Sequence, residues 1–185
     1  ANNCPATRPP SAVVISQIYG GGGNSGATYH NDYVELYNRG AGPVDLTGWS
    51  LQYASSTGSG WDSNKQPLGG AIGAGEYYLI ALASGGANGS ALPPANITGQ
   101  INMAAGSGKI ALVNSFTGLQ GNCPVFDPSI KDLVGYGSAD TFIVDDLMHA
   151  LERLIARPPH DQHARAVTAL LQLIAQRLRR SVVGK

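Results

Sequence analysis

Short apolar and polar runs alternate along the chain as far as Ala139, in the pattern of half-buried β-strands. In residues 32–38 (DYVELYN), the side chains of Tyr33, Glu35 and Tyr37 point one way, and those of Val34 and Leu36 point the other. Turn-forming Gly, Pro, Asn and Ser separate the runs. Strands are also predicted at residues 12–19, 49–53, 76–83, 97–101, 109–114 and 130–136. Seven short strands with such turns predict an antiparallel β-sandwich.

After Ala139 the apolar period changes from two residues to the 3.6 residues of an α-helix. One apolar stripe ends at Pro158-Pro159, and a second follows Asp161, a residue suited to a helix N-cap. We therefore expect a β-sandwich domain over residues 1–139 and an α-helical hairpin over residues 140–185. Two apolar helix faces need a covering surface, so the hairpin is a candidate for packing on the sandwich or for self-association as a homo-oligomer.

Composition changes at the same boundary. Of the 25 Gly residues, 24 lie before residue 140, and the balanced charge of the whole chain divides into −2 before that residue and +2 after it. Without a basic excess, binding of nucleic acid through bulk positive charge is excluded. An apolar content of 43% excludes a disordered chain, and no apolar stretch is long enough to span a membrane.

The two cysteines, Cys4 and Cys123, have no spacing typical of a zinc site. The small residue Ala1 at the start suits a chain from which a signal peptide has been removed, so we expect a secreted protein. In that setting a Cys4–Cys123 disulfide is one interpretation, and two unpaired thiols are the other.

Residues 31–53 (NDYVELYNRGAGPVDLTGWSLQY) resemble the signature of the lamin tail domain, an immunoglobulin-like β-sandwich. The segments IGAGEYYLIA (72–81), GSGKIALVN (106–114) and IKDLVGYGSA (130–139) resemble later strands of that family. The sequence is similar to modules near the start of secreted bacterial proteins, notably extracellular nucleases, where a separate domain carries catalysis. The resemblance implies a non-catalytic accessory module. Residues after Ala139 depart from the family, in which Asn-Cys and a Gly/Ser-rich linker follow, so the family partner of Cys123 is absent.

The segment VDLTGWSL (44–51) has the composition of a turn that leads into the core. Asp45 and Thr47 can bond to nearby backbone, and Gly48 permits a positive φ. Trp49 is then expected to be the large core aromatic residue of the sandwich. Glu35, in the middle of a strand, is expected to face solvent or to pair with Arg39 or a backbone donor.

Candidate binding residues lie on two loops. His30, Asn31 and Asp32 form the densest polar group, although a polar loop leading into a strand is the simpler interpretation. The other loop, residues 53–61, combines Trp61 with Ser and Gly and resembles a recognition surface, unless Trp61 only covers the sandwich. Asp62 and Asn64 follow it with the alternating oxygens of a calcium loop, so Ca²⁺ is a possible ligand, although the Gly and distal Glu of an EF-hand are missing.

No catalytic motif of the GxSxG, HExxH or P-loop type occurs, and no catalytic or metal site is predicted. Two other functions stay open beside the accessory module. One is a nuclease fragment in which Asp32 contributes to metal-dependent DNA hydrolysis. The other is a structural assembly unit built on the hairpin. Protein, polysaccharide and nucleic acid all remain open as ligands.

Overall fold

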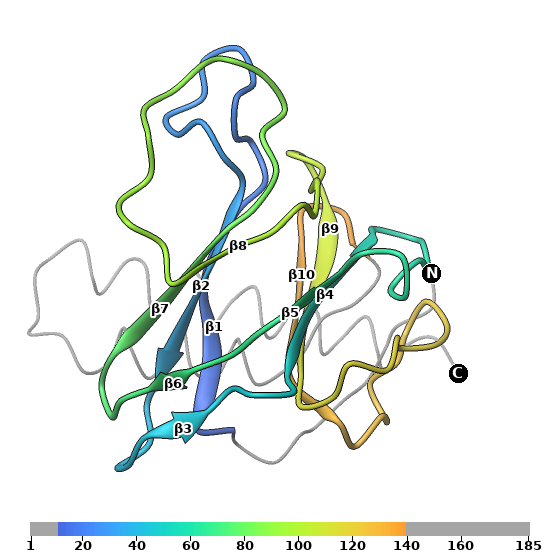
Figure 1. The fold of residues 1–185 in the computed structure, drawn as a ribbon. Helices are drawn as coiled ribbons and strands as arrows, with labels where there is room; N and C mark the ends of the chain where they lie inside the picture. The colour runs from blue at the N-terminus through green and yellow to red at the C-terminus, as the bar shows by residue number, and fades with distance from the viewer. Residues whose placement is uncertain (1–10, 140–185) are drawn as a thin grey trace, which may run out of the picture. The chain divides into compact units, whose positions relative to one another are not determined.

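A computed structural model describes residues 11–139. Throughout that range the regular structure consists of β-strands, with no helix (Figure 1). The predicted hairpin at residues 140–185 lies outside the described residues, as does Cys4. Cys123 is disulfide-bonded, so the alternative of an unpaired Cys123 thiol is excluded. Because Cys4 lies outside the described residues, its pairing with Cys123 stays a prediction.

Two four-stranded sheets and one small two-stranded sheet make up the fold (Figure 1). The first sheet has the order β1 (Val13–Tyr19), β2 (Tyr33–Asn38), β7 (Tyr77–Ala81) and β8 (Ile97–Thr98), with only β8 parallel to its neighbour. The second has the order β10 (Ile130–Tyr136), β9 (Gly108–Val113), β4 (Ser50–Ser55) and β5 (Lys65–Pro67), all antiparallel. The small sheet pairs β3 (Val44–Asp45) with β6 (Ala71–Ile72).

The prediction of a mainly β sandwich is confirmed. Each of the seven predicted strands forms, and three strands of two or three residues, β3, β5 and β6, were not predicted. Strands this short contain too few residues to carry a recognisable alternation. The predicted strand at 97–101 is reduced to the two residues of β8, although Ile101 beyond it is buried in the core.

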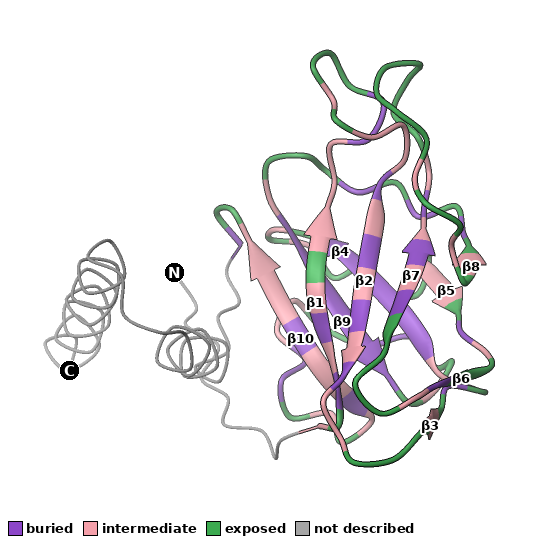
Figure 2. Ribbon diagram, turned by 90° about the vertical axis from the view of Figure 1, so that its left-hand side faces the viewer, coloured by how far each residue is buried: buried purple, intermediate pink, exposed green. Residues whose placement is uncertain are grey.

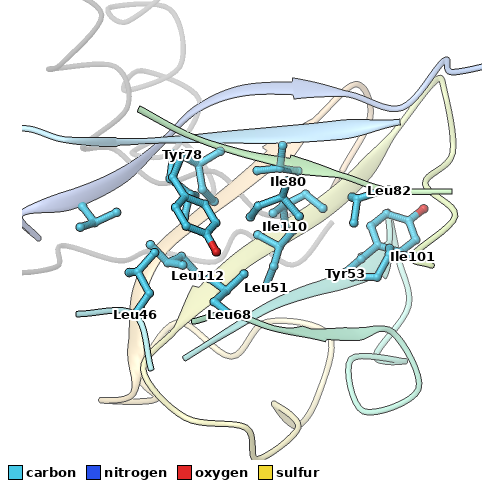
Figure 3. Close-up of a cluster of buried hydrophobic side chains, with 14 of the residues drawn as sticks. Leu46, Leu51, Tyr53, Leu68, Tyr78, Ile80, Leu82, Ile101, Ile110 and Leu112 are labelled. Carbon is cyan, nitrogen blue, oxygen red and sulfur yellow. The ribbon is translucent and has the colours of Figure 1, made fainter. Parts of the chain in front are cut away.

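The core lies between the inner faces of the two large sheets (Figure 3). Leu36 and Ile80 of the first sheet belong to the same buried cluster as Leu51, Ile110 and Leu112 of the second. Full burial of each such side chain contributes about 1.5–3 kcal/mol. The inner positions of β2 are Val34 and Leu36, as the alternation in the sequence predicts.

The outer faces of the two sheets differ. Buried and partly exposed residues alternate along β2, whereas all six residues of β9 and five of the six residues of β4 are buried (Figure 2). On the second sheet the residues that point away from the core are therefore covered as well. The covering loops are residues 56–64 and 114–129, which bond to side chains of β4 and β9.

The turn after β3 forms as predicted, while its tryptophan is less buried than predicted. The Thr47 N–H donates to the Asp45 carboxylate over 2.8 Å, and Gly48 has a φ of 80°. Trp49, however, is only partly buried at the margin of the core, and Trp61 is the fully buried tryptophan. Trp49 therefore packs against the core as expected, but the buried aromatic rings inside the core come from Tyr53 and Tyr78.

Candidate functional site

Two long loops lie side by side at one end of the first sheet (Figure 1). Residues 20–32 join β1 to β2, and residues 82–96 join β7 to β8. Gly23 pairs with Asn88 and Tyr29 with Ser90, and the His30 N–H donates to the Ser90 carbonyl over 2.8 Å. The backbone bonds between them hold the two loops together as one extension of the sheet.

Asp32 lies at the base of this extension and holds it to the rest of the sandwich. Its carboxylate is 1% exposed and accepts the N–H groups of Gly22 over 2.9 Å and Met103 over 2.8 Å. A side chain at position 22 would collide with the backbone of Asn31 and Asp32, so the close approach requires glycine. Burial raises the pKa of Asp32, and the two hydrogen bonds oppose that rise only in part.

These contacts support the simpler interpretation of Asp32, that of a residue in a polar loop leading into a strand. A group that reacts with or binds an external ligand needs access to it, and both oxygens of this carboxylate are already bonded to backbone inside the protein. The physical reason is the position of Asp32 directly before β2. There its side chain points toward the core, where a polar group must find hydrogen-bond partners within the protein.

His30 and Asn31 do line an open pocket of about 440 Å³. The Asn31 side chain donates to the Leu82 carbonyl over 2.8 Å, which fixes one of its sides. The pocket lies beside the β7–β8 edge of the first sheet and is lined mainly by small and apolar groups, among them Ala81, Leu92, Pro93 and Thr98.

The second predicted loop belongs to another part of the molecule. Trp61 has no exposed surface, and its indole N–H donates to the Gly121 carbonyl over 2.8 Å. Asp62 forms an ion pair with Lys65 at 2.6 Å, and the Asn64 amide donates to the Gly60 carbonyl. Trp61 therefore covers the sandwich, which was the alternative to an exposed recognition surface, and residues 53–64 do not line the pocket beside His30.

The calcium interpretation finds no assembled ligand set in this loop. The ammonium group of Lys65 lies against the Asp62 carboxylate, where a cation would otherwise bind. Within residues 11–139, no three His, Cys, Asp or Glu side chains lie close enough together to hold a metal ion.

A cluster of three tyrosines stands on the outer face of the first sheet, beside the two-loop extension. Tyr19 and Tyr33 are opposite each other in the β1–β2 register, and their rings stack with centroids 5.4 Å apart. Tyr29 meets both edge-on, at 5.9 Å and 5.7 Å. The Tyr19 hydroxyl accepts the Thr28 N–H over 2.9 Å, so the cluster is tied to the loop.

A tyrosine pair lies further along the same face. Tyr37 of β2 and Tyr77 of β7 are opposite each other in register, with ring centroids 4.8 Å apart, and Tyr77 is 60% exposed. Glu35, which precedes Tyr37 on this face, accepts the Ser16 hydroxyl over 2.6 Å. The predicted partner Arg39 instead donates to the Ser11 carbonyl.

We call this surface, made by Tyr19, Tyr29, Tyr33, Tyr37 and Tyr77, the tyrosine face. It continues into the pocket, because Ala81 lies opposite Tyr33 in the β2–β7 register and also lines the pocket. The sequence interpretation did not assign it to binding, although the alternation of residues 33–37 already separated these tyrosines from Val34 and Leu36. The remaining three tyrosines, Tyr53, Tyr78 and Tyr136, lie in or against the core.

The tyrosine face carries little charge. Burial raises the pKa of Tyr33, and the neighbouring Tyr29, Glu35 and Tyr19 raise it further, so its phenol stays neutral at pH 7. Across residues 11–139 there are seven acidic residues and four basic ones, and one of the basic residues, Lys109, is fully buried on the second sheet. The described part of the chain is therefore an acidic body with a nearly neutral aromatic surface.

The family model for the Lamin Tail Domain matches residues 6–136, most of the β domain. No curated protein matches the chain. Within residues 11–139 there is no helix long and apolar enough to cross a membrane.

Proposed function

Because the chain belongs to the lamin tail domain family, we propose that it is a non-catalytic binding module of a secreted bacterial protein, and that the tyrosine face contacts its ligand. The observation that carries the proposal is the gathering of five of the eight tyrosines on one outer sheet surface. The three other tyrosines lie in or against the core, whereas these five keep surface that a ligand can contact.

The geometry of these side chains suits binding. A tyrosine ring offers a large contact area and a polar hydroxyl group, and it loses little conformational freedom because it has only two side-chain torsions. Two of the rings are already held in place by hydrogen bonds. The Tyr19 hydroxyl accepts the Thr28 N–H, and the Tyr33 hydroxyl donates to the Gln17 side chain over 3.0 Å. A surface arranged before the ligand arrives avoids part of the ordering cost of association.

The secreted setting is supported by the disulfide at Cys123, since such bonds persist in oxidising compartments. A non-catalytic role is supported by the position of Asp32, the residue on which a contribution to DNA hydrolysis would depend. Its carboxylate is bonded to two backbone N–H groups in the interior.

The binding test presents the full chain with four probes: a neutral glucan, alginate, duplex DNA and intact bacterial cells. The test variant is Tyr37→Ala/Tyr77→Ala, and the matched control is Phe126→Ala, which removes another aromatic residue that is 85% exposed. We expect at least one probe to bind the wild type and the control, and to bind the double variant roughly tenfold more weakly or worse. Equal binding by all three proteins would contradict the assignment of the site.

The same preparations are incubated with plasmid DNA and Mg²⁺ or Ca²⁺. We expect no cleavage. Metal-dependent cleavage by the purified full chain would show that the accessory-module proposal is wrong and would restore the nuclease interpretation.

A further inference from the structure

We propose that the ligand of the tyrosine face is an uncharged polysaccharide chain. The inference rests on the function proposed above and names the chemical class that the surface recognises. Its basis is the combination of partly or largely exposed aromatic rings, polar groups between them and the absence of basic residues from the strands β1, β2 and β7 that form this face.

The tyrosine face has two aromatic contact points in a line along β2. Tyr33 belongs to the three-ring cluster and Tyr37 to the exposed pair, and four residues of a strand separate them by about 13 Å. A ligand that contacts both points must be extended, and it must present apolar surface more than once along its length. A polysaccharide does this, because each sugar ring has a face of C–H groups that packs against an aromatic ring.

Polar hydrogen-bonding groups, one of them the Glu35 carboxylate, lie between the two contact points. Gln17 and Glu35 are opposite each other in the β1–β2 register, and Gln17 is exposed. Amide, carboxylate and phenol groups are suited to sugar hydroxyl groups, which both donate and accept. The hydroxyl groups at the edges of a sugar ring would meet this row while the ring faces pack on the tyrosines.

Charge selects an uncharged chain over a nucleic acid or an acidic polysaccharide. Single-stranded nucleic acids also stack on aromatic side chains, but they need Lys and Arg along the path of the phosphates. The strand residues that form this face carry Glu35 and no basic residue within the described range. Arg39 follows the end of β2 and donates through Nε to the Ser11 carbonyl over 2.7 Å.

The pocket adds a third contact region at the end of the same surface. Ala81 connects it to Tyr33, and Leu92 and Pro93 supply apolar walls beside His30. An extended chain that lies over Tyr37 and Tyr33 can therefore continue onto the two-loop extension.

The experiment is affinity electrophoresis of the full chain in native gels. The gels contain hydroxyethyl cellulose, xyloglucan or laminarin as uncharged polysaccharides, or alginate as the acidic one, and labelled single-stranded DNA is tested separately by mobility shift. We expect at least one uncharged polysaccharide to retard the wild type, and alginate and DNA to have no effect. The dissociation constant should rise roughly tenfold or more in Tyr37→Ala/Tyr77→Ala. Tyr77→Phe keeps the ring and removes only the hydroxyl, so it should lose clearly less affinity than Tyr37→Ala/Tyr77→Ala.

Two controls separate binding from folding. Phe126→Ala should be retarded as strongly as the wild type, because Phe126 lies on the 114–129 loop that covers the second sheet. Thermal unfolding of each variant shows that the variants are folded under the conditions of the gel.

Each of the other outcomes overturns the inference in a recognisable way. If alginate or DNA binds and the double variant abolishes that binding, while no uncharged polysaccharide binds, the ligand class is wrong and the binding function stands. If an uncharged polysaccharide retards wild type and double variant equally, the site is wrong. If none of these probes and no bacterial cells bind the wild type, both the inference and the proposed function fail.

Discussion

The outer faces of the two large sheets both belong to four-stranded sheets, but they differ in how far they are covered. On the first sheet the outer positions include tyrosines that stay partly or largely exposed, and on the second the outer positions of β4 and β9 are covered by two loops. The fully buried residues there include Trp61, Lys109 and Gln52. An aromatic residue in a polar, glycine-rich sequence can therefore be buried under a loop or stay exposed on a sheet. Only the position of the neighbouring loops decides whether it stabilises the fold or remains available to a ligand.

Trp61→Ala should produce the largest effect on this comparison. The indole is fully buried, and its N–H is bonded to the Gly121 carbonyl, so truncation leaves a cavity and an unpaired acceptor. We expect a loss of about 3–5 kcal/mol in the free energy of unfolding, measured with urea. Phe126→Ala, which removes an exposed aromatic residue, should change the same quantity by less than about 0.5 kcal/mol. A small loss at Trp61 would show that the 56–64 loop does not depend on its packing.

Lys109→Met tests the polar part of the covered face. The Lys109 ammonium donates to the carbonyls of Gly58 (2.8 Å) and Asn122 (2.7 Å), and it lies 5.6 Å from the centroid of the Trp61 ring. Hydrogen bonds from a charged donor contribute about 1.5–3 kcal/mol each, while methionine recovers part of that loss through apolar packing. We expect unfolding at lower urea concentration, with a net loss of roughly 2–3 kcal/mol.

The control for this change is Lys131→Met on β10, a partly exposed position. It should alter the urea midpoint little, as surface substitutions usually do. Comparable losses in the free energy of unfolding at both positions would show that the buried Lys109 stabilises the fold no more than the partly exposed Lys131 does.

Asp32→Asn tests the base of the two-loop extension. An amide keeps the shape of the carboxylate, but it turns one acceptor into a donor that faces the N–H of Gly22 or Met103. We expect a loss of about 1–3 kcal/mol in the free energy of unfolding. Because the extension lies beside the pocket, hydrogen exchange at Gly22 and Gly85 should also become faster.

The pH dependence of the Asp32→Asn effect has a defined sign. Burial raises the folded pKa of Asp32 above its usual 3.8, so near that pH the folded state holds a proton that the unfolded chain has released. The contribution of this carboxyl to stability therefore decreases as the pH rises from 3.8 through the folded pKa. The wild type should show this decrease relative to Asp32→Asn in urea titrations across that range. A relative increase would mean that the two backbone hydrogen bonds outweigh burial.

Tyr77→Ala should have the smallest effect on stability. Tyr77 is 60% exposed, and its main contact is the ring of Tyr37, a pair that contributes about 0.5–1.5 kcal/mol. We expect thermal unfolding to show a loss of no more than about 1 kcal/mol. A loss as large as that of Trp61→Ala would show that the tyrosine face is packed and would remove the contrast between the two outer faces.

Much of the fold followed from local patterns, whereas the site did not. The alternation of residues 33–37 predicted the inner Val34 and Leu36, and the match to the lamin tail domain covers most of the same strands. The same alternation placed Tyr33 and Tyr37 on the opposite face, but nothing in it says whether that face is covered. His30 lies on a loop, as the sequence predicted. Apart from Asn31, the residues that line the pocket with it come from residues 81–98, far along the chain. For Trp61 and Asp32 the sequence left a binding role and a structural role open, and both residues are buried, because burial depends on contacts from distant segments.

The class of fold, the longer strands and the inner side of residues 33–37 follow from the sequence alone, because apolar side chains on a pleated strand have a period of two. What covers the other side depends on the tertiary structure. The loop that contains Gly121 passes over Trp61 and the second sheet, while the outer side of the first sheet keeps its tyrosines partly exposed. Loop paths depend on hydrogen bonds between residues that are far apart in the chain, such as Trp61 and Gly121, and no local pattern records them.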